Sequence, residues 1–176
     1  MDKKDIRRLI LLALFVSMAS VLHVVEGWLP LPLPVPGMKL GLANLMSLVA
    51  LVLLGWRAAF YVVFGRVFIG SLFGGTFMGP SFAMSVNGAV ASVLVMTLAY
   101  HRLRPLFSLV GISLLGAIAH NLAQLAVAAL LVGSETMFWY LPYLLLFALP
   151  TGVGTGYTAA YFLLKLPRGT FTEKNV

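Results

Sequence analysis

The sequence predicts an all-α, polytopic membrane protein folded as a six-helix transmembrane bundle. Apolar residues make up 61% of the 176 residues and charged residues only 10%, whereas a soluble domain carries roughly 25% charged residues. The apolar residues form six long runs, and the basic residues gather between those runs on one side. Because so few charges cannot cover a water-facing surface, the composition argues against a soluble domain, a disordered tail and a secreted scaffold.

The charge and cysteine counts narrow the function classes. The chain has no cysteine, which excludes disulfides, thiol catalysis and thiolate metal sites. A net charge of +7 points to nucleic acid in some soluble proteins, but here the charges lie at the ends of apolar runs. We therefore expect a lipid bilayer as the surroundings and no nucleic-acid partner.

The six predicted spans cover about residues 9–25, 39–55, 57–73, 81–99, 106–132 and 138–164. Each approaches or exceeds the roughly 20 apolar residues that cross a bilayer, and the shorter ones use flanking residues or thin the bilayer locally. Together they occupy nearly all of residues 1–176, which therefore form a single transmembrane domain with no room for a soluble catalytic domain.

The first span follows a basic segment, as a signal peptide does, but Glu26–Pro30 is a poor small-residue cleavage site, so we expect a retained helix. The second and third spans form a tight hairpin through Gly55–Arg57. The fourth begins near Pro80, after a glycine-rich turn. The last two are long enough to tilt or break, and Pro150–Gly156 predicts an interruption with a kink in the sixth.

The basic residues predict the orientation. With the N-terminus inside, the inner side holds ten of the twelve: Lys3, Lys4, Arg7, Arg8, Arg57, Arg102, Arg104, Lys165, Arg168 and Lys174. Only Lys39 lies at the outer side, and Arg66 lies within a span. This distribution follows the positive-inside rule. It predicts a multi-pass protein of the cell membrane with both termini in the cytoplasm.

The connection from Glu26 to Met38 contains four prolines at alternate positions, from Pro30 to Pro36. Alternating prolines cannot be helical and favour an extended, stiff segment. This strap is either a lid over an outward-facing pocket or a rigid spacer between two helices.

Several polar residues fall inside the predicted spans. Arg66 lies about nine residues, or roughly 14 Å, from the inner end of the third span, where a charged group suggests function. It either lines a cavity and binds an anionic ligand or is a structural arginine that reaches outward. The other candidate substrate-binding residues are Asn44, Asn87, His120, Gln124 and Lys39. Each also has a structural interpretation, because polar side chains often join membrane helices.

No catalytic residue, metal site or cofactor is predicted. The chain has no phosphate-binding glycine-lysine loop, no HExxH and no aspartate after Asp5. The short tails leave no room for an ATPase on this chain, so uphill transport would take its energy from a partner or an ion gradient. Small residues four apart, such as Ala13 and Ser17, suit either packing within the bundle or docking of a partner.

Two stretches, Pro36–Leu45 and Gly79–Gly88, together with the six-span plan, resemble the Gx transporter family, often labelled heptaprenyl diphosphate synthase component I. That family is similar to the substrate-binding S components of energy-coupling factor (ECF) transporters. The resemblance covers about residues 6–165. It implies an outward-opening pocket and a membrane partner with cytoplasmic ATPases, which S components contact through small residues of the first helix. Ala13 and Ser17 match that pair, with serine in place of the usual second alanine.

The leading hypothesis is therefore a transport protein of the S-component type that binds a small organic nutrient or precursor, either anionic or uncharged. The first alternative is a non-catalytic membrane subunit associated with heptaprenyl or polyprenyl diphosphate synthesis. A catalytic synthase is not expected, because magnesium needs hard oxygen ligands and the aspartate-rich motifs are absent. The second alternative is a structural scaffold of a membrane complex.

Overall fold

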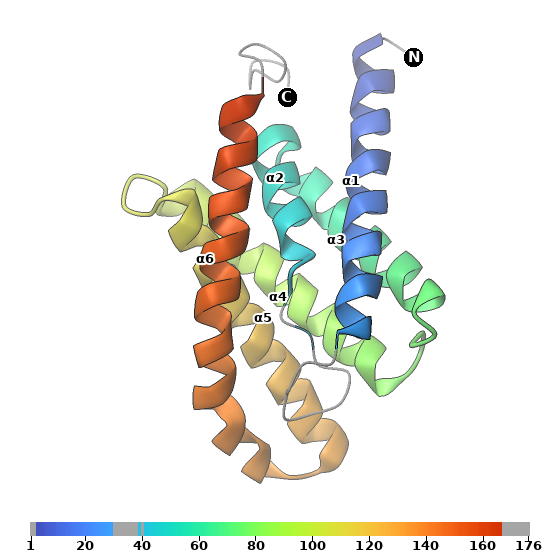
Figure 1. Ribbon diagram of the computed structural model, residues 1–176, viewed down its shortest axis with the longest axis vertical. Coiled ribbons are helices and arrows are strands. Elements are labelled where there is room, and N and C mark those ends of the chain that lie inside the picture. Colours follow the sequence, from blue (N-terminus) through green and yellow to red (C-terminus); the bar gives the residue numbers. More distant parts are fainter. Residues whose placement is uncertain (1–2, 30–38, 40, 167–176) are drawn as a thin grey trace.

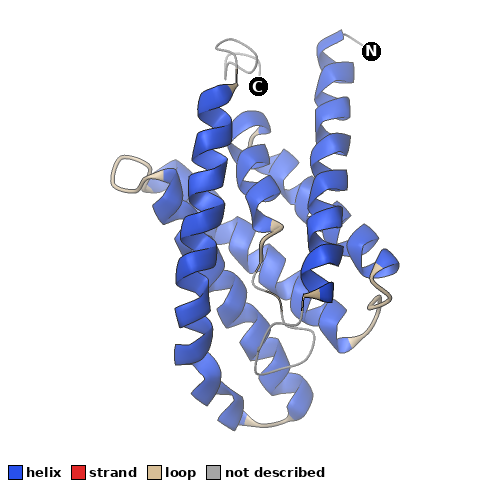
Figure 2. Ribbon diagram, viewed as in Figure 1, coloured by secondary structure: helices blue, strands red, loops and turns tan. Residues whose placement is uncertain are grey.

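The computed structural model describes residues 3–29, 39 and 41–166, and this part of the chain is built from helices without a strand (Figures 1 and 2). The helices are α1 (Lys3–Trp28), α2 (Asn44–Leu54), α3 (Trp56–Phe73), α4 (Pro80–Arg102), α5 (Leu109–Val132) and α6 (Leu141–Lys165), with the short 3-10 helix η1 (Glu135–Tyr140) before α6. The predicted all-helical class is confirmed for these residues. The proline strap lies outside the described residues.

Within the described residues, five helical segments are long and apolar enough to cross a membrane: Asp5–Trp28, Trp56–Phe73, Pro80–Arg102, Leu109–Val132 and Glu135–Lys165. The start of α1 and the end of α6 lie at the same end of the molecule (Figure 1). The described chain thus has the build of a membrane helical bundle.

The second predicted span differs from the structure. A helix was expected over 39–55, but α2 begins only at Asn44 and has 11 residues, which is about 16 Å of helix against a hydrocarbon core of about 30 Å. The physical reason lies at Gly41, whose positive φ of 85° is not helical. The N-terminus of α2 therefore lies inside the protein.

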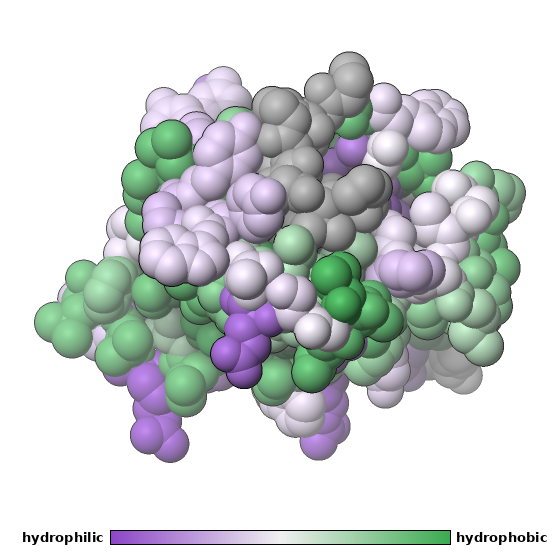
Figure 3. All heavy atoms as spheres, turned by 90° about the horizontal axis from the view of Figure 1, so that it is seen from below, coloured by the Kyte–Doolittle hydropathy of each residue, from purple (hydrophilic) through white to green (hydrophobic). Residues whose placement is uncertain are grey.

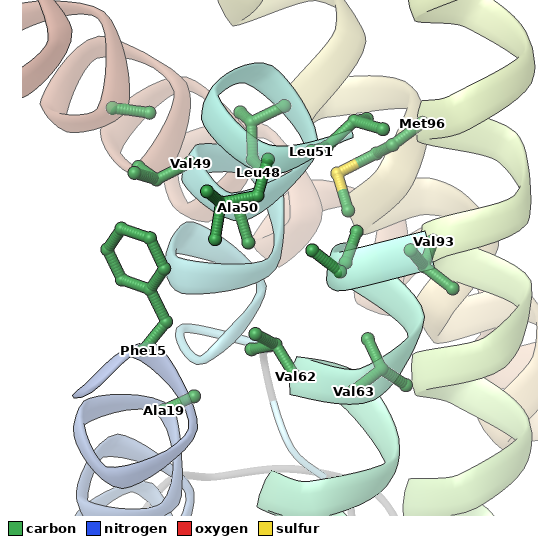
Figure 4. Close-up of a cluster of buried hydrophobic side chains, with 14 of the residues drawn as sticks. Phe15, Ala19, Leu48, Val49, Ala50, Leu51, Val62, Val63, Val93 and Met96 are labelled. Atoms are coloured by element: carbon green, nitrogen blue, oxygen red, sulfur yellow. The ribbon is translucent and has the colours of Figure 1, made fainter. Parts of the chain in front are cut away.

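The hydrophobic core surrounds α2. Leu48, Val49 and Ala50 are completely buried, and Figure 4 shows them beside core residues of α1, α3 and α4, such as Phe15, Val62 and Val93. A short helix that is apolar on every side suits this central position.

Much of the surface of the described residues is apolar. Large exposed apolar side chains occur on every long helix, for example Ile10 on α1, Phe73 on α3 and Leu130 on α5. Seen from the end where α1 and α5 finish, strongly hydrophilic side chains are few (Figure 3). Exposed apolar surface on this scale indicates a membrane or protein environment.

Helix α6 packs closely on α5. A Cβ placed on Gly156 would lie 2.7 Å from the Cα of Val110, and one on Gly152 would lie 2.8 Å from the Cα of Leu114. The interruption expected at Pro150–Gly156 does not occur, since α6 continues as helix through Pro150. The Thr151 hydroxyl donates to the carbonyl of Phe147 at 2.9 Å, and such local bonds help a proline-containing membrane helix to persist.

Candidate functional site

A polar cluster is enclosed at the N-terminal end of α2. The carboxylate of Glu26, near the end of α1, accepts hydrogen bonds from the backbone N–H of Gly41 at 2.5 Å and of Leu42 at 3.1 Å. Both N–H groups belong to the turn that leads into α2, just before its N-cap residue Ala43. Glu26 therefore fixes the start of α2 against α1.

Arg66 enters the same cluster from α3. Its side chain is only 2% exposed, and its Nη2 donates to Oδ1 of Asn44 at 2.7 Å. Asn44 is the first residue of α2, and Glu26 lies close enough to interact electrostatically with the guanidinium. The arginine is thus held inside the protein and does not face lipid.

Lys39 is buried as well, although the sequence placed it at the outer rim. Its Nζ donates to the carbonyl of His23 at 3.2 Å. Its backbone N–H donates to Oε1 of Gln124 at 3.0 Å, and its carbonyl accepts from Nε2 of the same side chain at 2.7 Å. Gln124 therefore anchors the backbone of Lys39 on α5.

Several buried polar atoms of the cluster have no hydrogen-bond partner within the described part of the chain. They are Nε of Arg66, Nδ2 of Asn44, Oγ of Ser85, Nε2 of His23 and both ring nitrogens of His120. Because buried polar groups are nearly always paired in native proteins, this concentration of unpaired donors and acceptors makes the cluster a candidate binding site.

Apart from Asn44, these residues line a narrow cavity, which in this structure leaves no room even for a water molecule. It is lined by His23, Glu26, Lys39, Gly41, Arg66, Ser85 and His120. In this structure the cavity is too narrow for an organic molecule, so binding one requires the surrounding elements to separate.

The charges of the cavity are unbalanced. Counted at their ordinary charges, Arg66 and Lys39 contribute two positive charges and Glu26 one negative charge. With His23 and His120 as neutral imidazoles, the formal charge is one positive. Low-dielectric surroundings strengthen the attraction of such a site for an anion.

The structure brings together five of the six candidate substrate-binding residues. Arg66, Lys39 and His120 line the cavity, whereas Asn44 and Gln124 hold Arg66 and Lys39 in place. Asn87 is not part of the cluster. Its side chain is exposed, and its Nδ2 donates to the Ala83 carbonyl of its own helix at 2.9 Å.

Sequence reasoning did not place four residues of the cavity. His23 and Glu26 stand about a turn apart at the end of the first predicted span, which favours a pair at the outer rim, but both are buried. Gly41 and Ser85 were not singled out. Ser85 precedes Asn87 by two residues, so it points to a different side of α4. The proline- and glycine-rich stretch before Gly41 indicates a turn in this region. The sequence does not show that the positive φ falls at Gly41.

A second, apolar groove lies outside this cluster, between α3 and α4. Its volume is about 380 Å³. It is lined by Val63, Phe64, Gly65, Val67, Phe68, Ile69, Phe82, Val86 and Val90.

The remaining predicted pair, Ala13 and Ser17, lies exposed on α1. The Ser17 hydroxyl donates a hydrogen bond to the carbonyl of Ala13 at 2.9 Å, so serine adds no unpaired polar group to that face.

Among the residues that the structure describes, no group of three His, Asp or Glu side chains is arranged to hold a metal ion.

An apolar helical bundle around an enclosed polar cluster defines a helical membrane protein with an internal cavity. The model of the heptaprenyl diphosphate synthase component I family matches residues 15–162, and the chain belongs to that family. The resemblance to the heptaprenyl diphosphate synthase component I family seen in the sequence is thereby confirmed. No curated protein and no solved structure matches the chain.

Proposed function

We propose that this protein is a membrane substrate-binding protein of the ECF S-component type, and that it binds a small organic anion in the cavity around Arg66. One observation carries the proposal: a buried cluster with one excess positive charge contains unpaired donors from α2, α3 and α4. Ionisable groups inside a membrane protein mark functional sites by default because placing them there is costly.

The free donors suit an oxyanion. Nε of Arg66, Nδ2 of Asn44 and Oγ of Ser85 are all buried without a partner in the described residues. A carboxylate accepts several hydrogen bonds from such groups, and bonds to charged partners are about twice as strong as neutral ones. His120 and His23 can then contact the organic part of the ligand.

Native mass spectrometry of the purified protein tests the proposal. We expect a small anionic metabolite to co-purify with the wild type and to be absent from the Arg66→Lys variant. A prenyl diphosphate would favour the second candidate below. Anion binding is contradicted if the wild-type protein retains no ligand and if no mixture of cell metabolites raises its thermal stability.

The second candidate is a non-catalytic membrane subunit associated with heptaprenyl diphosphate synthesis. The family match favours it, and so does the apolar groove between α3 and α4, which is wide enough for a hydrocarbon chain. Capture of the tagged chain from its native membrane distinguishes the two candidates. A soluble prenyl diphosphate synthase in the captured complex supports this candidate, and a membrane protein with ATPases supports the first.

We further propose that the chain crosses the cell membrane six times with both termini in the cytoplasm. Because α2 and the buried residues before it share one crossing, irregular backbone there is shielded by protein. Reporter domains fused at Val176 and inserted between Gly133 and Thr136 are expected to lie on opposite sides of the membrane. Reporters on the same side would contradict the six-crossing topology.

The outer face of α1 is the proposed docking surface for an energy-coupling membrane partner. Ala13 and Ser17 are exposed there, and small residues allow another helix to approach closely. Replacing both with tryptophan is expected to abolish co-purification of the partner without changing ligand binding. The control is Leu130→Trp, at a position on α5 that is 82% exposed. Equal loss of the partner in both variants would contradict a specific role for α1.

A further inference from the structure

Among the residues that the structure describes, Glu26 is the one carboxylate that lines the cavity, and both of its oxygens are already engaged. They accept the N–H groups of Gly41 and Leu42. The carboxylate therefore binds the two N–H groups of the turn that leads into α2. A ligand has to bind elsewhere in the cavity, on donors that Glu26 leaves free.

The groups that carry these free donors have one uncompensated positive charge in total. Nε of Arg66 is unpaired in the described chain, and the ammonium of Lys39 uses one donor for the His23 carbonyl although it has three. Of the two positive charges, Glu26 compensates one. One positive charge remains for the ligand.

We infer that the cavity accepts monoanions and rejects dianions, and that Glu26 is the residue that sets this limit. The inference rests on the proposed function, because it names the charge class of the ligand bound there. A bound monoanion brings the cavity to neutrality, whereas a dianion leaves one negative charge buried and uncompensated. Juxtaposed like charges and uncompensated buried charges are strongly unfavourable.

Methanesulfonate and sulfate make a matched pair of probes, because both are small tetrahedral anions and they differ by one charge. Acetate serves as the planar monoanion. The readout is the NMR signal of the Arg66 Nε–H in protein with ¹⁵N-labelled arginine, identified by its absence from Arg66→Lys. This signal reports on the cavity directly and needs no knowledge of the natural ligand.

In the wild type we expect acetate and methanesulfonate to shift the Arg66 signal in a saturable way, with sulfate weaker by on the order of 100-fold. Glu26→Gln keeps an oxygen acceptor for α2 but removes the negative charge, so sulfate should gain relative to methanesulfonate. Glu26→Asp keeps the charge and should retain the wild-type preference. It preserves the test if Glu26→Gln does not fold. Glu135→Gln is the matched control, since Glu135 is exposed on η1.

Three outcomes overturn the inference. Sulfate binding as tightly as methanesulfonate shows that charge is not selected, while anion binding itself stands. An unchanged preference in folded Glu26→Gln, or a lost preference in Glu26→Asp, removes the assigned role of Glu26. If none of the three anions shifts the Arg66 signal, the cavity binds no anion and the proposed function falls with the inference.

Discussion

Arg66→Lys is expected to lose most of the affinity for the anionic ligand while the protein still folds. Lysine keeps the positive charge but loses the planar fork that donates to Asn44 and, through Nε, to the cavity. Each hydrogen bond to a charged group contributes about 1.5–3 kcal/mol. The affinity should therefore fall roughly 10- to 150-fold.

Arg66→Ala should have a larger effect, because it also leaves Glu26 with less positive charge nearby. Removing one partner from buried charges costs about 3–5 kcal/mol of stability, so a lower melting temperature is expected together with complete loss of the ligand. Calorimetric titration with the co-purified ligand and thermal unfolding in detergent measure the two effects.

Arg57→Lys is the matched control for the arginine chemistry. Arg57 is exposed at the beginning of α3, where its guanidinium lies 5.3 Å from the centroid of the Trp56 ring. We expect wild-type affinity from this variant. If Arg66→Lys and Arg66→Ala both bound ligand as the wild type does, Arg66 would be purely structural and the proposed site would be wrong.

Gly156→Leu is expected to separate α6 from α5 and to destabilise the bundle. A Cβ at Gly156 would lie 2.7 Å from the Cα of Val110 and 2.8 Å from the Cβ of Ser113. Because one of those atoms belongs to the backbone, the neighbour cannot rotate away, and the helices must move apart. Overpacking costs about 1–3 kcal/mol, occasionally more. The shift should also break the 2.8 Å hydrogen bond between Ser113 and Thr155.

Gly154→Leu is the control on the same helix, since a Cβ there meets no atom within 4 Å. Both variants replace a helical glycine with the same residue, so backbone propensity changes equally and only packing differs. Thermal unfolding of the two proteins in detergent should separate them clearly. Equal stability of both variants would show that α5 and α6 do not depend on this close approach.

Most of the helices could be predicted because each is a long apolar run. The predicted span 57–73 falls within α3 (Trp56–Phe73), and 81–99 falls within α4 (Pro80–Arg102). The beginning of α2 was wrong by five residues. The sequence stays apolar through Leu40 and Leu42, so hydropathy predicts that the helix begins earlier than it does. Hydropathy cannot show that the backbone turns at Gly41, or that Glu26 accepts a hydrogen bond from the Gly41 N–H.

The candidate site was predictable in part for the same reason. Arg66 and His120 stand out because a charged or ionisable side chain is unusual in an apolar run. Gln124 and Asn44 stand out in the same way, but sequence spacing does not reveal that one binds the backbone of Lys39 and the other binds Arg66. Asn87, like Asn44, is a polar residue in an apolar run. Its side chain nevertheless faces outward and donates a hydrogen bond to a carbonyl of its own helix.

The sequence by itself determined the membrane class, the helical content and the family, because these depend on composition, on runs of apolar residues and on local motifs. Only the tertiary structure decided which polar residues meet. Glu26, Lys39 and Arg66 are separated by 13 to 40 positions in the chain, and their proximity depends on how α1, α2 and α3 pack. An isolated charge in an apolar segment shows that burial must be compensated, but the compensating partner is chosen by packing across helices, which no local pattern encodes.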